Sequence, residues 1–144
     1  MMCYTVFRVK EGRYLKMEAL ILNKIKFDYE LATNPKSKRF TDYHDIYKCV
    51  MKYNGKQYSF EYQTNTHANG EPKLAEVLEC LVSDMGFYET SKDIFDFACK
   101  LGYDYDNPDC KKAYEGCKRT SEALHRIFTD DELGMIDDDL FYRS

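Results

Sequence analysis

The sequence has no tryptophan, only three histidines and seven glycines, and no apolar run near the roughly 20 residues that a membrane span requires. The histidines, His44, His67 and His125, are far apart along the chain. The motifs G-x-S-x-G and H-E-x-x-H and a glycine-rich phosphate loop are all missing. These absences argue against serine hydrolases, zinc peptidases and nucleotide-binding enzymes. We therefore expect no catalytic residues, no cofactor and no metal ion.

The six cysteines do not follow a zinc-binding pattern, because no C-x-x-C pair comes with a second pair or with suitably spaced histidines. Cys110 and Cys117 lie two helical turns apart, about 10 Å along a helix axis, which is too far for a disulfide within one helix. The first residues alternate and carry early charges, unlike a secretion signal. We expect a soluble cytosolic protein with six free thiols, namely Cys3, Cys49, Cys80, Cys99, Cys110 and Cys117.

The first half of the chain has the two-residue period of β-strands. Apolar and polar side chains alternate over residues 25–31, 43–53 and 58–64. Asn54-Gly55 between the last two segments predicts a type I′ hairpin turn, in which both central residues have positive φ. A further strand is expected over residues 3–9, followed by a turn, whereas residues 14–22 fit either a strand or a short helix.

After Pro72 the apolar period becomes helical. A second helix, capped by Ser91 and ended by Gly102, is predicted next. A third helix starts near Pro108, with Asp106 or Asn107 as its cap, and a short acidic helix or tail follows.

The expected fold is therefore α+β, with an antiparallel meander of three or four strands (residues 1–65) packed against three or four helices (72–136) in one domain, 1–144. The predicted core comprises Tyr29, Tyr47, Met51, Phe60, Leu78, Leu81, Phe97, Leu101, Tyr114, Leu124 and Phe128.

The segment "GYDYDNPDC" raises the question of a calcium loop. Asp104, Asp106 and Glu115 occupy positions 1, 3 and 12 of a twelve-residue frame. Pro108 stands at position 5, however, and Asp109 stands at position 6, where the EF-hand requires glycine for its sharp turn. We therefore interpret this segment as a corner between two helices.

Four motifs resemble a family of small proteins encoded by temperate bacteriophages and prophages. They are VLECLVSD (77–84), FDF (95–97), GYDYD (102–106) and KAYEGC (112–117). The resemblance spans residues 44–128, and the first 22 residues have no counterpart. Asn107-Pro108 replaces the serine and basic residue that are usual in the family. The resemblance implies a phage accessory protein in the host bacterial cytoplasm, with anti-CRISPR activity as one possibility.

Charge is unevenly distributed along the chain. Residues 1–72 carry a net charge of +4 and residues 73–144 carry −8. Six carboxylates fall within ten residues, which fits either a functional surface or a solvated, partly frayed terminus. These six candidate partner-binding residues are Asp130, Asp131, Glu132, Asp137, Asp138 and Asp139.

Two functions remain open. The acidic half, the 13 tyrosines and the phage resemblance favour an inhibitor that binds a host nucleic-acid-handling protein, with a CRISPR–Cas effector as the named candidate. The alternative is a phage accessory nucleic-acid-binding protein of the DNA-metabolism region. It would use the basic loop Lys36, Lys38 and Arg39 together with a strip of Lys24, Lys26, Lys48 and Lys52. A membrane partner is not expected, and the sequence leaves the oligomeric state open.

Overall fold

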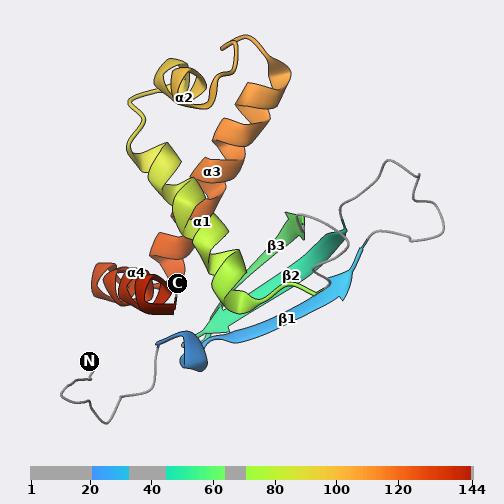
Figure 1. Cartoon of the computed structure of the whole chain (residues 1–144), viewed down its shortest axis with the longest axis vertical. Coiled ribbons are helices and arrows are strands. Elements are labelled where there is room, and N and C mark those ends of the chain that lie inside the picture. The colour runs from blue at the N-terminus through green and yellow to red at the C-terminus, as the bar shows by residue number, and fades with distance from the viewer. Residues whose placement is uncertain (1–20, 33–44, 64–70, 144) are drawn as a thin grey trace.

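The computed structural model describes residues 21–32, 45–63 and 71–143, in which strands come first and helices follow (Figure 1). The elements are η1 (Ile21–Lys24), β1 (Lys26–Leu31), β2 (Ile46–Tyr53), β3 (Lys56–Gln63), α1 (Leu74–Glu89), α2 (Ile94–Leu101), α3 (Pro108–Ile127) and α4 (Asp130–Arg143). The α+β class, with its strands in the N-terminal half and its helices in the C-terminal half, is thereby confirmed. The strand expected over residues 3–9 lies outside the described residues.

The sheet is an antiparallel meander in the order β1-β2-β3. Met51 on the central strand pairs with Phe27 on one side and Tyr58 on the other. The predicted hairpin turn is confirmed, since Asn54 and Gly55 have φ values of 51° and 80°. This turn fixes the register of β2 against β3, and therefore decides which side chains share a face.

One face of the sheet is buried and the other faces solvent. Tyr47, Cys49 and Met51 are buried in the covered face, while Lys48 and Lys52 point to the other face and are exposed. The alternation predicted for β2 is therefore correct. Tyr29 was expected in the core but is exposed, because it lies on the edge strand β1, where its hydroxyl hydrogen-bonds Glu71 instead of packing under a helix.

Helices α1 and α3 pack against each other, and α1 crosses the covered face of the sheet (Figure 1). Leu78, Leu81, Leu124 and Phe128 are buried at this junction, as predicted. They form the main core together with Met51 and residues of η1 and α4. Phe60 is half-buried at its margin.

A second, smaller core lies at the far end of α1 and α3, where α2 packs on α3 away from the sheet (Figure 1). Phe97, Cys110 and Cys117 are buried there, and Tyr114 is half-buried with its ring 5.2 Å from that of Phe97. Leu101 was also expected in this core but is exposed, because it is the last residue of α2 and the chain turns away at Gly102.

The residues that begin and end the helices at this corner are those predicted from the sequence, except Ser91. Gly102 ends α2 in the left-handed conformation, with φ 78°, and Asn107 caps α3 ahead of Pro108 by accepting the amide of Asp109 at 2.8 Å. Ser91 is not the cap of α2, because its hydroxyl donates to the Phe87 carbonyl at the end of α1. Asp93 takes that role instead.

The acidic segment is a packed helix rather than a frayed terminus. Thr129 and Glu132 form a capping box, in which each side chain accepts a hydrogen bond from the other residue's backbone amide, at 3.1 and 2.9 Å. Leu133, Ile136 and Leu140 are buried in the main core. The helix continues to Arg143, seven residues beyond the limit expected from the sequence.

Candidate partner-binding surface

The six acidic residues of α4 divide into an inner pair, which holds the helix in place, and an outer group, which faces solvent. Glu132 and Asp139 form the inner pair and are half-buried. Besides its part in the capping box, Glu132 accepts a 2.6 Å hydrogen bond from the Tyr53 hydroxyl. Asp139 accepts one of 2.9 Å from the Ile21 amide. The inner pair therefore anchors α4 to the sheet and to η1.

Of its neighbours, Tyr53 has the largest effect on the pKa of Glu132. Its hydrogen bond stabilises the carboxylate, as do the bonds from Thr129, and together they hold the pKa of Glu132 below its usual range. The same contact raises the pKa of the Tyr53 hydroxyl. Glu132 is thus an ionised structural group, and its negative charge is already engaged within the fold.

The outer carboxylates form two rows along α4. Asp130 and Asp137 are seven residues apart and share one face, and Asp131 and Asp138 share the adjacent face. All four are exposed, and Asp130 lies 3.6 Å from the ring of His125. The apolar side chains of Met135 and Phe141, which are 47% and 74% exposed, lie on the same side of the helix. We call this surface the acidic face of α4, and it comprises Asp130, Asp131, Met135, Asp137, Asp138 and Phe141.

A serine, a histidine and a carboxylate meet between α1 and α3, but in the wrong order for nucleophilic catalysis. Glu89 Oε2 accepts from the Ser121 hydroxyl at 2.7 Å and lies 2.5 Å from His125 Nε2. In a catalytic triad the histidine contacts the serine, whereas here the carboxylate lies between them. Ser121 is also buried. We interpret this cluster as a polar clamp between the two helices.

The part of the chain that the structure describes contains no group of three or more histidine, cysteine or acidic side chains able to hold a metal ion. Its five cysteines are free, as predicted, and Cys3 lies outside the described residues. Burial raises the pKa of Cys49 and of Cys117 to about 11, so both thiols are protonated at neutral pH. Within the described ranges, no helix is long and apolar enough to cross a membrane.

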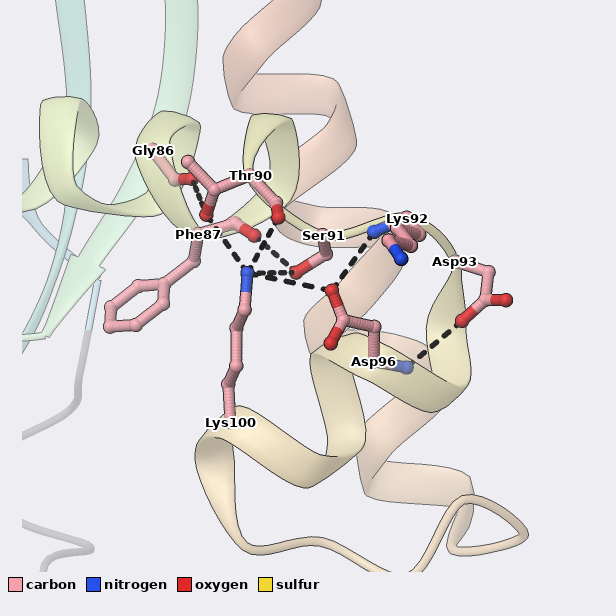
Figure 2. A network of polar contacts seen from close by, with 8 residues as sticks. All are labelled: Gly86, Phe87, Thr90, Ser91, Lys92, Asp93, Asp96 and Lys100. Carbon is pink, nitrogen blue, oxygen red and sulfur yellow. Dashed lines mark hydrogen bonds and ion pairs between the residues drawn. The ribbon is translucent and has the colours of Figure 1, made fainter.

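A second exposed surface, which the sequence did not predict, lies at the corner around α2. Phe95 and Tyr105 are 56% and 62% exposed, and their ring centroids are 4.9 Å apart. Figure 2 shows the polar contacts that join α2 to the end of α1: the Lys100 ammonium donates to the Thr90 carbonyl at 2.6 Å and lies 3.6 Å from Asp96. Phe95 is not among the predicted core residues, and a helical projection places it away from the face that carries Phe97 and Leu101.

The basic residues expected to serve the alternative function, nucleic-acid binding, do not all lie together. Lys36, Lys38 and Arg39 lie outside the described residues. Of the predicted strip, Lys48 is separated from the rest because Glu30 and Glu61 are its direct cross-strand neighbours. Lys24, Lys26 and Lys52 lie together at the hairpin end of the sheet.

No protein-family model matches the chain, and neither a curated protein nor a solved structure matches it. Function must therefore be inferred from the chemistry of the surfaces and from the sequence motifs. The acidic face of α4 offers exposed carboxylates beside two apolar side chains on an ordered helix, an arrangement suited to binding a cationic protein surface.

Proposed function

We propose that the protein is a non-catalytic inhibitor that binds a host nucleic-acid-handling nuclease through the acidic face of α4. One observation carries this proposal: α4 is anchored by Glu132, Asp139 and three buried apolar residues, while four carboxylates project from its other side. Because the helix is already ordered, little conformational entropy is lost when a partner binds it.

The chemistry of a nuclease suits this surface. An enzyme that binds nucleic acid carries lysine and arginine side chains along its phosphate channel, and these attract a row of carboxylates by complementary potential. Exposed apolar groups such as Met135 and Phe141 supply surface that becomes buried at the centre of an interface. Blocking a channel in this way needs no catalytic group on the inhibitor.

The named candidate for the partner is a CRISPR–Cas effector. The resemblance to phage-encoded proteins would imply a target in the host bacterial cytoplasm, where an infecting phage gains from its inhibition. The proposed function is thus that of an anti-CRISPR protein. Its support is the acidic face together with the motif resemblance across residues 44–128.

Cleavage of a target plasmid by purified, guide-loaded CRISPR effectors tests this function. We expect the wild-type protein to inhibit at least one effector, and the double variant D137K/D138K to inhibit it at least tenfold less, since like charges across an interface are strongly unfavourable. These two positions are exposed and lie outside the first turn of α4, so their reversal leaves its N-terminal carboxylates in place.

The matched control is E115K/E122K, which makes the same change in net charge on an exposed face of α3. It should inhibit within about twofold of the wild type. If none of the CRISPR effectors tested is inhibited, the assignment of the target is wrong. If both double variants inhibit as well as the wild type while circular dichroism shows an unchanged fold, the acidic face of α4 is not the docking surface.

A further inference from the structure

Four lysines line one open hollow of about 340 Å³ at the hairpin end of the sheet. Lys24 comes from η1, Lys26 from β1, Lys52 from β2 and Lys56 from β3, and all four are exposed. Among the described residues the rest of the lining is Tyr53, Asn54, Gly55 and Gln57, so none of their side chains there is a carboxylate. We call this feature the lysine hollow.

Strand pairing brings two of these lysines together, because Lys26 and Lys52 are directly opposed across the β1-β2 ladder on the solvent-facing side of the sheet. The Asn54-Gly55 turn brings Lys56, the partner of Tyr53, to the same end of the sheet from its other face, and η1 contributes Lys24. Like charges directly opposite each other destabilise a sheet. Lys48, on the same face as Lys52, faces no such repulsion, because both of its cross-strand partners are glutamates. A bound anion would relieve the repulsion in the lysine hollow.

The surroundings add one further cation and one carboxylate. Arg126 on α3 donates from Nη2 to the Gln57 carbonyl at 2.8 Å, which brings a fifth cation beside the hollow. Lys56 helps to lower the pKa of Glu132, so this carboxylate partly compensates the charge of Lys56. Its oxygens accept hydrogen bonds from Tyr53 and Thr129, so they face groups of the protein itself.

We propose that the lysine hollow is an anion site that binds the phosphate groups of a polyanion. The ammonium groups act as point charges for phosphate oxygens. The Tyr53 ring packs against Phe128, with centroids 4.9 Å apart, and is not available to stack on a base. Binding is therefore independent of base sequence, and the source of the phosphates is either a single-stranded nucleic acid backbone or inorganic polyphosphate. This site is separate from the acidic face of α4 and does not depend on the function proposed for it.

Fluorescence anisotropy with the full chain and a fluorescein-labelled twelve-nucleotide oligo-dT tests the site, with sodium tripolyphosphate as the competitor. Titrations at several salt concentrations give the slope of log K against log salt. Single strands give about −0.7 for each neutralised phosphate, so four contacts predict a slope of about −2.8. Removing two lysines in K26Q/K52Q should change it to about −1.4 and weaken binding about tenfold or more at low salt.

A second pair, K24Q/K56Q, should give the same result, and it tests the site even if the first variant folds poorly. The matched control, K48Q/K118Q, removes two exposed lysines elsewhere and should bind within about twofold of the wild type. In amide NMR spectra, added oligonucleotide should shift Asn54 and Gly55 in the turn.

Competition by tripolyphosphate at equal phosphate concentration would assign the site to compact polyphosphates. Binding of the oligonucleotide without such competition would assign it to the spaced phosphates of a nucleic acid backbone. The site is disproved if the wild type binds neither probe at 20 mM salt, a concentration at which such contacts are strongest. It is also disproved if K48Q/K118Q weakens binding as much as the hollow variants do, or if only K36Q/K38Q/R39Q abolishes binding.

Discussion

The hydroxyl of Tyr53, at the end of β2, donates a 2.6 Å hydrogen bond to Glu132 Oε2, in the first turn of α4, across 79 residues of chain. The Tyr53 ring also packs on Phe128, just before the same helix. The hairpin and the acidic helix are thereby joined by one side chain. Two surfaces of opposite charge, the lysine hollow and the acidic face of α4, have their positions fixed relative to each other by this contact.

Replacing Glu132 should destabilise the protein more than replacing an acidic residue of the outer face. E132A removes both the capping box and the acceptor for Tyr53, so we expect the free energy of unfolding to fall by about 1–2 kcal/mol. D131A, one residue away and exposed, should change it by less than about 0.5 kcal/mol. Urea denaturation at pH 7 measures both, and equal effects of the two variants would show that Glu132 is not an anchor.

The contribution of Glu132 should also depend on pH. Its pKa in the folded protein lies below the ordinary value of 4.5, chiefly because Tyr53 and Thr129 donate to the carboxylate. A depressed folded pKa stabilises the protein fully above the unfolded pKa, and this stabilisation is lost as the pH falls through the folded pKa. The difference in unfolding free energy between wild type and E132Q should therefore shrink from pH 6 to pH 2.5. A difference that stays constant over this range would contradict the assigned contacts.

Two glycines should respond oppositely to alanine. Gly102 has φ 78° at the end of α2, so G102A should cost about 1 kcal/mol. Gly134 lies inside α4, where an added methyl group meets no atom within 4 Å, so G134A should raise the free energy of unfolding by up to about 1 kcal/mol. Thermal unfolding followed by circular dichroism distinguishes the two, and a stabilising G102A would rule out the left-handed cap.

Local signals predicted most of the backbone correctly. Asn54-Gly55, Gly102 and Asn107-Pro108 each impose a specific turn or cap, and each has that role in the structure. Alternation also identified the buried face of β2, because a central strand packs on the core along its whole length. The misplaced core residues, Tyr29 and Leu101, lie at the edge or end of an element, where tertiary packing decides burial and periodicity does not.

The candidate surface was predicted less completely. The six clustered carboxylates were visible in the sequence, but their division into anchors and outer residues depends on Tyr53 and Ile21, which are distant along the chain. One local signal was available, since Thr129 followed by Glu132 matches the capping box that starts an ordered helix. Three lysines of the lysine hollow were in the predicted strip, but separating Lys48 from them and adding Lys56 required the strand register, which charge counting does not provide.

Cysteine labelling tests the two cores. In the native protein at pH 8 we expect a maleimide to modify the exposed Cys99 first, then Cys80, which is exposed but whose pKa is raised by burial, and the three buried thiols last. Cys49 and Cys117 have a pKa of about 11, so roughly a thousandth of each is thiolate at that pH. Peptide mass spectrometry over time resolves the sites. Labelling of Cys49 as fast as Cys99 would show that the covered face of the sheet is open.

Asp84 on α1 is a half-buried carboxylate whose pKa is raised by burial. A raised folded pKa in an acid means that ionisation disfavours folding, and this cost appears as the pH rises through the folded pKa. D84N should therefore be more stable than the wild type at pH 7 and lose that advantage near pH 3. E79Q, an exposed acid on the same helix, is the control and should change little. Lower stability of D84N at pH 7 would indicate that the carboxylate has a favourable role.

The central claim is that the acidic face of α4 meets a basic surface on a nuclease, and the association rate constant at varied salt tests it most directly. For an inhibited CRISPR effector, biolayer interferometry should show wild-type association slowing about tenfold or more from 50 to 500 mM NaCl, because screening removes electrostatic steering. D137K/D138K should associate at least about tenfold more slowly at 50 mM NaCl, while E115K/E122K stays within about twofold of the wild type. Equal rates and equal salt dependence for the wild type and D137K/D138K, with the fold unchanged, would contradict the account.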